Sequence, residues 1–214
     1  MRDHDERRRR SDLTGRVVEI GAGTGLTFPH YPRTVTSVVA AEPNLQRRAA
    51  AMRAARGAHV PIEVVGAVAE DLPMADDAVD AAVTSLALCS VSDVAGALAE
   101  LRRVLRRRGE LRFLEHVIAA RGPLRALQRL AAPLYSRMPD GCHIDRDTLA
   151  SIARAGFAIE QCEHFLHAEG ALEPAIPYVL GTARRSGPAP DADPVSRGPG
   201  RRTSAALLPP AARR

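Results

Sequence analysis

The chain has 214 residues, of which 45% are apolar, so it can bury one core but is too short for two full domains. All 30 basic residues are arginine and the net charge is +5, yet the excess lies at the ends: residues 184–214 hold seven arginines against two aspartates, and residues 1–16 hold six against four acids. Since a nucleic-acid footprint should be clustered on the folded face, this charge distribution disfavours nucleic-acid binding.

Short β-branched runs alternate with longer segments of helical spacing between residues 17 and 184. This alternation predicts βαβ units and therefore an α/β fold with a doubly wound, mostly parallel sheet. In chain order we expect strands over residues 16–20, 36–41, 62–65, 79–85, 110–115, 157–164 and 178–183, with helices over residues 45–56, 94–105 and 146–155. Asp147 near its start and Gly156 after its last turn delimit the third helix.

The remaining segments are less regular. Residues 122–140 contain Pro123, Pro133 and Pro139 around an apolar, arginine-rich helix, which we interpret as an insertion beside the active site. The arginine run at residues 106–108 is interpreted as a solvated helix end, where cations favour the helix dipole. We expect one folded domain over residues 16–185, a disordered Pro/Ala/Arg-rich tail over residues 186–214, and disorder or a remnant lid over residues 1–15.

The first strand runs directly into a glycine-rich loop. Gly21, Gly23 and Gly25 permit a tight turn and a close approach of the backbone to a ligand. Their spacing differs from the G-x-G-x-x-G of dinucleotide-binding folds, and Glu19 stands two residues before the first glycine. A pyrophosphate disfavours an adjacent carboxylate, whereas S-adenosylmethionine (SAM) carries an ammonium and a sulfonium. The loop therefore favours SAM over NAD.

Three later segments complete a nucleoside site. Glu42 ends the second predicted strand, where a carboxylate can accept both ribose hydroxyls. Residues 66–73 follow the third strand and would lie along the edge of an adenine ring. The end of segment 80–86 would lie under the methionine part.

With these four motifs, residues 16 to about 120 resemble class I SAM-dependent methyltransferases of the methyltransferase type 11 family. The resemblance implies a Rossmann-like, seven-stranded sheet with helices on both faces and an antiparallel last strand. It implies that the glycines line the methionine, Glu42 holds the ribose, Ala69 and Glu70 flank the adenine, and Ser85 and Leu86 close the site. The full set of cofactor residues expected is Glu19, Gly21, Ala22, Gly23, Gly25, Glu42, Pro43, Ala69, Glu70, Ser85 and Leu86.

Two positions depart from the family pattern. Val68 stands where many members have Asp or Asn to bind the adenine amino group, and Arg107-Arg108-Gly109 replaces the usual Pro-Gly-Gly. Within the family, three strings are similar to small-molecule enzymes related to the membrane-associated alkyl-thiol methyltransferases of animals: Leu88-Cys89-Ser90-Val91, Phe113-Leu114-Glu115-His116-Val117 and Asp140-Gly141-Cys142-His143.

The resemblance implies SAM-dependent methylation of a small-molecule acceptor, a thiol, hydroxyl or amine. One alternative is a non-catalytic SAM-binding protein, which Val68 and the short N-terminal segment motivate. Another is RNA or protein methylation, although Ser85-Leu86-Ala87-Leu88 stands where an adenine amino-methyltransferase has an Asn/Asp-Pro-Pro-Tyr string.

Methyl transfer from a sulfonium is an in-line displacement, so alignment of the acceptor is the main requirement. A base that takes the acceptor's proton would help, and histidine suits this at neutral pH. His116, after the fifth strand, and His143, in the turn beyond Cys142, are the candidates. His4, His30, His59, His164 and His167 lie in no motif and are interpreted as surface or satisfied groups.

The cysteines and the hydropathy pattern carry the remaining expectations. Cys89, Cys142 and Cys162 are scattered and form no CxxC pair, so we expect reduced thiols and no metal site, with Cys89 in the core and Cys142 a packed thiol. The chain has no uninterrupted run of eighteen apolar residues and no apolar core of a signal peptide near its start. We therefore expect a cytoplasmic protein that does not contact a membrane.

Overall fold

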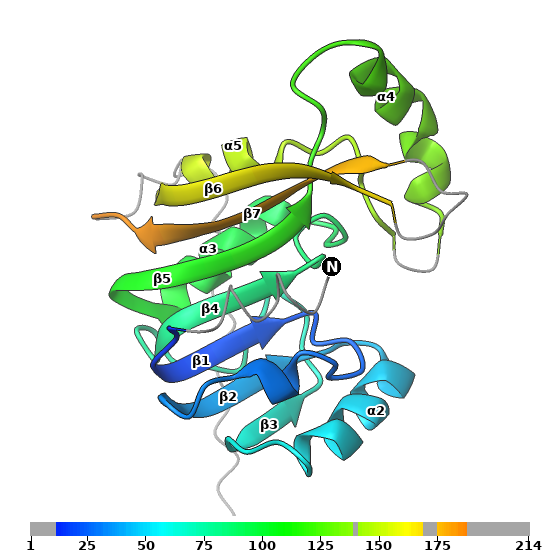
Figure 1. The fold of residues 1–214 in the computed structure, drawn as a ribbon. Coiled ribbons are helices and arrows are strands. Elements are labelled where there is room, and N and C mark those ends of the chain that lie inside the picture. The colour runs from blue at the N-terminus through cyan, green and yellow to red at the C-terminus, as the bar shows by residue number, and fades with distance from the viewer. Residues whose placement is uncertain (1–11, 139–140, 169–174, 188–214) are drawn as a thin grey trace, which may run out of the picture.

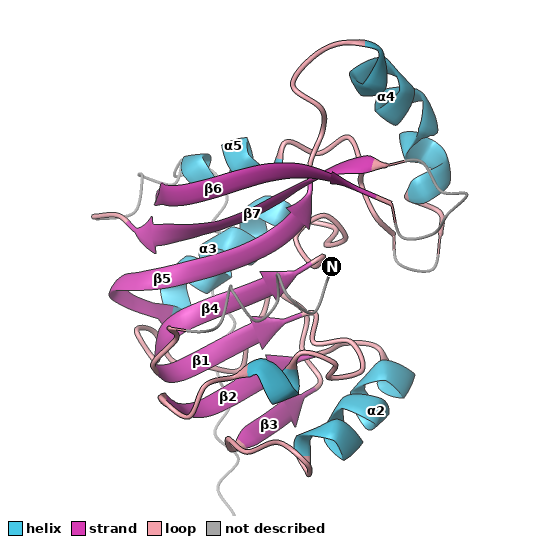
Figure 2. Cartoon of the chain, viewed as in Figure 1, coloured by secondary structure: helices cyan, strands magenta, loops and turns pink. Residues whose placement is uncertain are grey.

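The computed structural model describes residues 12–138, 141–168 and 175–187. The expected lid remnant and tail fall mostly outside these ranges, as do His4, Pro139 and Asp140. Within them, seven strands form one sheet in the order β3-β2-β1-β4-β5-β7-β6 (Figures 1 and 2). The strands are Gly15–Ile20 (β1), Val35–Ala41 (β2), Ile62–Val65 (β3), Val79–Ser85 (β4), Leu105–His116 (β5), Phe157–His167 (β6) and Ile176–Arg185 (β7).

Strand directions follow the prediction. The strands β1 to β5 run parallel to one another, while β7 is inserted between β5 and β6 and is antiparallel to both. The predicted doubly wound α/β fold with an antiparallel last strand is confirmed. Because the parallel strands end at one edge of the sheet, the loops that follow them are gathered there (Figure 1).

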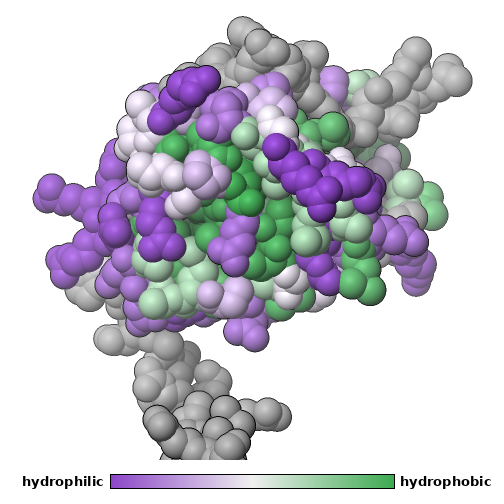
Figure 3. Space-filling model, turned by 90° about the horizontal axis from the view of Figure 1, so that it is seen from below, coloured by the Kyte–Doolittle hydropathy of each residue, from purple (hydrophilic) through white to green (hydrophobic). Residues whose placement is uncertain are grey.

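Helices cover both faces of the sheet, because the central strands bury side chains on each side. In β1, Val18 belongs to the core under α3 (Val94–Val104) and α5 (Thr148–Arg154), and Val17 belongs to the core under α2 (Leu45–Ala55) and the short helix η1 (Phe28–His30). Seen from the β3 end of the sheet, the surface also has an apolar area among hydrophilic residues (Figure 3).

Side-chain caps set the starts of three helices. Asn44 accepts hydrogen bonds from the backbone at the start of α2, Asp93 does so for α3, and Asp147 does so for α5. Gly156 has φ +81° after α5, as its predicted role at the helix end requires. The third predicted helix therefore ends as expected and begins two residues later than predicted.

The arginine run is a correction. Arg106, Arg107 and Arg108 do not end a helix; they are part of β5, which begins at Leu105, immediately after α3. Leu105 is fully buried and pairs with Val79 of β4, and the Arg106 guanidinium forms an ion pair with Asp80. Burial of Leu105 and this acidic partner on the neighbouring strand favour an extended backbone over the helix end that the charge run predicted.

The predicted insertion contains α4 (Pro123–Tyr135), which extends beyond the sheet at the edge where the parallel strands end (Figure 1). Gln128 attaches it: its Nε2 donates to the carbonyls of Val117 and Ile144, both at 2.9 Å, and its Oε1 accepts from the Ala119 N–H. None of the helices among the described residues is long and apolar enough to cross a membrane.

Candidate functional site

A cleft of about 1340 Å³ opens at the carboxyl ends of β1 and β4 and extends along β5 toward α4. In doubly wound sheets, ligands bind where the strand order reverses, which here is between β1 and β4. Pockets for one small molecule usually measure roughly 300–1,000 Å³. The cleft is therefore large enough for a nucleoside cofactor and a second, smaller molecule.

The cleft brings together almost all of the predicted site residues. Gly25 and His143 are the exceptions. The lining includes Glu19, Gly21, Ala22, Gly23, Glu42, Pro43, Ala69, Glu70, Ser85, Leu86 and His116.

Gly25 has a packing role. A Cβ at this position would lie 2.7 Å from the Phe28 ring and 2.9 Å from Ala54 Cβ, and its φ is +81°. His143 is half-buried, and its backbone N–H donates to the Cys89 carbonyl at 2.7 Å. Burial and the nearby Arg146 charge lower the pKa of His143, which leaves its ring neutral at physiological pH. It holds the backbone behind the cleft rather than lining it.

The glycine loop presents its backbone to the cleft at Gly23. Its φ is +58°, and a Cβ placed there would meet no atom within 4 Å, so the space in front of the loop is open. Gly21 differs, because a Cβ there would lie 2.7 Å from that of Ala87. Gly21 is therefore required for packing, and Gly23 leaves room that a ligand can fill.

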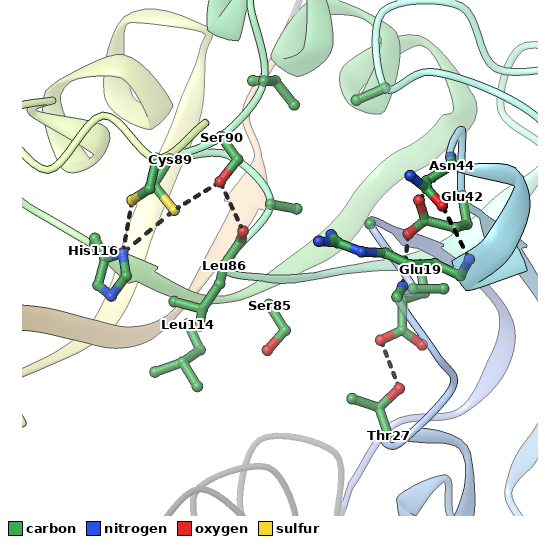
Figure 4. A pocket seen from close by; sticks show the side chains of 18 of the residues that line it. Glu19, Thr27, Glu42, Asn44, Ser85, Leu86, Cys89, Ser90, Leu114 and His116 are labelled. Carbon is green, nitrogen blue, oxygen red and sulfur yellow. Dashed lines mark hydrogen bonds between the residues drawn. The ribbon is translucent and has the colours of Figure 1, made fainter. Parts of the chain in front are cut away.

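Glu42 closes this half of the cleft from the end of β2. It is 4% exposed, and its two oxygens accept hydrogen bonds from the N–H groups of Gly23 at 2.8 Å and Asn44 at 2.9 Å (Figure 4). Each carboxylate oxygen keeps a further lone pair that can accept a hydroxyl. A ribose with two neighbouring hydroxyls fits this arrangement.

Glu19 lies beneath the loop and is 1% exposed. It accepts hydrogen bonds from the Thr27 hydroxyl at 2.9 Å and the Tyr31 hydroxyl at 2.7 Å. The carboxylate therefore joins β1 to the chain that follows the glycines and lines the same cleft. Such a site suits a cationic ligand better than a pyrophosphate, as the sequence indicated.

The segment after β3 forms the outer wall of this half. Val68 is 46% exposed and presents an apolar side chain to the cleft. Glu70 Oε1 accepts the Asp93 N–H at 3.1 Å, which ties the wall to the start of α3. Ala69 and Glu70 thus line the cleft beside Val68, whose side chain offers an apolar contact.

Glu115, at the end of β5, is a residue that sequence reasoning missed. Its fully buried carboxylate accepts three backbone N–H groups, from Ala87 at 3.2 Å, Leu88 at 3.1 Å and Cys89 at 3.0 Å. Burial raises the pKa of Glu115. The carboxylate fixes the turn after β4, where Leu86 has φ +55°. The sequence signals were an acid inside an apolar strand and its place in the string Phe113-Leu114-Glu115-His116-Val117.

The other half of the cleft contains an imidazole and two thiols. His116 Nδ1 lies 3.7 Å from Cys89 Sγ (Figure 4). The same nitrogen lies 2.9 Å from Cys142 Sγ. The ring is nine-tenths buried, and its Nε2 has no hydrogen-bond partner among the described residues. The hydrogen bond with Cys142, reinforced by burial, raises the pKa of Cys89 well above its ordinary value. Cys142 packs against His116 and lines the cleft.

Apolar side chains surround this imidazole. Tyr178 of β7 meets the His116 ring edge-on, with 4.4 Å between ring centroids, and Phe165 of β6 stacks on Tyr178. Leu114 of β5 and Leu134 of α4 also line the cleft. Figure 4 shows the Glu19 and Glu42 carboxylates on one side of Ser85 and the His116 group on the other. One half suits a polar nucleoside, and the other suits an apolar molecule.

Comparison with known proteins gives related sequences and folds. Residues 18–113 match the family described as a methyltransferase domain. The chain is 34% identical over 151 residues to thiol S-methyltransferase TMT1B of Rattus norvegicus, which is 69% of this chain and 62% of the relative. It is 32% identical over 171 residues to thiol S-methyltransferase TMT1A of Homo sapiens, which is 78% of this chain and 69% of the relative. The chain thus spans less than two thirds of the rat protein.

A solved structure shares the fold. Geranyl diphosphate C-methyltransferase of Streptomyces coelicolor, in complex with S-adenosyl-L-homocysteine, superposes with a TM-score of 0.67. The superposition covers 86% of this chain and 77% of that protein, at 18% sequence identity.

Proposed function

The chain belongs to this methyltransferase family, and from that premise we propose that it transfers the methyl group of SAM to the sulfur of a small thiol. Its cofactor is SAM. The observation that carries the proposal is the continuity of the cleft: the glycine loop with Glu42 and the apolar corner around His116 line one cavity. A cofactor and an acceptor bound in the two halves would face each other.

The cofactor half holds the residues for SAM. When bound, SAM supplies a methyl group activated by its positive sulfonium. Glu42 would accept the ribose hydroxyls, and the open space at Gly23 would admit the methionine part close to the backbone. Glu19 contributes negative charge below the loop, which favours a cationic ligand. Val68, Ala69 and Glu70 would border the adenine.

The acceptor half supports a thiol. Direct displacement requires an aligned acceptor and the exclusion of water, which the apolar wall of Leu114, Phe165 and Tyr178 provides. The thiolate is the reactive form of a thiol, so a group that favours ionisation accelerates the reaction. We place His116 in this role because its buried ring lines the cleft beside the apolar wall and its Nε2 has no hydrogen-bond partner among the described residues. The named activity of the two relatives agrees with a sulfur acceptor.

Two assays test the proposal. Calorimetric titration of the full chain with SAM should show binding at one site. Transfer of a labelled methyl group should then occur to a short alkanethiol in preference to a phenol or an amine of similar size. Absence of SAM binding by the folded protein would overturn the proposal, and preferential methylation of the phenol or the amine would overturn the thiol assignment.

A further inference from the structure

Cys89, His116 and Cys142 form a group that methyl transfer does not by itself require. Each offers one ligand atom, and the three atoms lie within 4.8 Å of one another on the wall of the cleft. We propose that they bind a soft divalent metal ion, Zn²⁺ by its ligand preference, and that the acceptor thiol becomes its fourth ligand. The acceptor part of this inference rests on the proposed function.

The donor set selects the ion. Two thiolates and one imidazole with an open position are the ligands of a catalytic zinc site, because structural zinc sites fill all four positions with protein groups. Thiolates suit soft or borderline ions and disfavour Mg²⁺ and Ca²⁺, which take oxygen ligands. No fourth protein ligand accompanies the three among the described residues. The remaining position is therefore available to a molecule in the cleft.

The distances are close to those of a tetrahedral ion. Zn–S bonds of about 2.3 Å and Zn–N bonds of about 2.0–2.1 Å place a sulfur and a nitrogen about 3.6 Å apart. Cys89 Sγ and His116 Nδ1 are separated by 3.7 Å, which meets this requirement. Cys142 Sγ is 2.9 Å from the same nitrogen, a hydrogen-bond distance. Ligation would replace that hydrogen bond and needs the sulfur to withdraw by about 0.7 Å.

Rigid elements hold two of the three ligands. The Cys89 N–H donates to Glu115, and its carbonyl accepts the N–H of His143. The His116 carbonyl accepts the Thr148 hydroxyl at 3.1 Å. These bonds fix the backbones of Cys89 and His116 on the buried side of the cleft. Cys142 is half-buried on the loop that precedes α5, so it is the ligand with room to adjust.

Charge favours the reaction that such a site would serve. Two thiolates neutralise a divalent ion, so a thiolate acceptor as fourth ligand leaves one net negative charge beside the positive sulfonium. The acceptor thiol releases its proton to solvent when its sulfur binds. The sulfur then forms a bond to the methyl carbon while the carbon–sulfonium bond breaks, which leaves a thioether and neutral S-adenosylhomocysteine. The electrons and the charge balance without an oxidant or a reductant.

Metal binding can be measured without methyl transfer. The full chain, reduced and treated with a chelator, is titrated with Co²⁺, which reports thiolate ligation by an intense charge-transfer absorption, and with Zn²⁺ by calorimetry. We expect binding of one ion per chain and the thiolate absorption. Cys142→Ser, and Cys142→Ala as a second variant, should weaken Zn²⁺ binding at least tenfold. The matched control Cys162→Ser removes an exposed thiol outside the cluster and should bind as the unchanged protein does.

The titration separates this inference from the proposed function. Addition of a short alkanethiol should alter the cobalt spectrum, and SAM affinity should be unchanged in both Cys142 variants, which verifies that they are folded. Absence of the thiolate absorption, or equal loss of Zn²⁺ binding in the Cys162 control, would overturn the metal site. Thiol methylation that persists in excess chelator would overturn the metal site and leave the proposed function intact. A bound ion without any thiol methylation would overturn the proposed function and leave the metal site intact.

Discussion

The two halves of the cleft are built in different ways. In the cofactor half, the glycine loop follows one strand directly and Glu42 reaches it from only 19 residues away. In the acceptor half, His116 meets Cys89 and Cys142 from 27 and 26 residues away, on three different segments. The cofactor half depends on backbone conformation that glycines permit, whereas the acceptor half depends on side chains that the fold brings together. Substitutions should therefore separate cofactor binding from acceptor chemistry.

The largest effect is expected at Glu115, which supports the turn after β4. Glu115→Ala leaves three buried N–H groups without their acceptor, and each unsatisfied group costs about 1–3 kcal/mol. The free energy of unfolding should fall by about 3 kcal/mol or more, measured by denaturant titration. Glu63→Ala, which removes an exposed carboxylate on β3, is the control and should change it by less than about 0.5 kcal/mol. Equal stability of the two variants would contradict the support role of Glu115.

A substitution at His116 should slow methyl transfer to the acceptor and leave the affinity for SAM unchanged. His116→Gln should lower the rate of methyl transfer to an alkanethiol on the order of a hundredfold, because the group that favours the thiolate is lost. The dissociation constant for SAM should stay within twofold of the original protein's. His164→Gln, on the exposed side of β6, is the matched control and should leave both quantities unchanged.

A substitution at Glu42, unlike one at His116, should weaken SAM binding. Glu42→Ala removes a charge-assisted acceptor worth about 1.5–3 kcal/mol, so SAM should bind ten- to a hundredfold more weakly. Calorimetric titration measures this, with Glu63→Ala again as the control. SAM affinity equal to that of the unchanged protein would show that Glu42 does not hold the ribose.

The smallest effect is a dependence of stability on pH. Burial raises the pKa of Glu115 in the folded state, so the folded protein retains this proton to higher pH than the unfolded chain does. The contribution of Glu115 to stability is thus fully present below the usual glutamate pKa and is lost as pH rises through the raised folded value. The unfolding free energy of the unchanged protein relative to Glu115→Gln should fall over that interval. A difference that rises with pH would contradict the assigned direction.

The sequence allowed most of the fold and the cofactor half to be predicted. Strand patterning and helix caps are local, and the loop signal lies in consecutive residues, so Gly23 and Glu42 could be placed before any contact was known. The start of β5 could not be predicted, because the pairing of Leu105 with Val79 outweighs the preference of an arginine run for a helix end. The contact between Cys142 and His116 could not be predicted either, since no local pattern encodes a contact between distant segments.

The most direct test of a cofactor half joined to an acceptor half is the dependence of methyl transfer on SAM concentration in two variants. With an alkanethiol at fixed concentration, increasing SAM should restore the rate of Glu42→Ala toward that of the unchanged protein, because the lost interaction affects SAM binding. The rate of His116→Gln should stay low even at saturating SAM. Restoration of His116→Gln by SAM, or a Glu42→Ala rate that saturating SAM leaves unchanged, would contradict the division of the cleft.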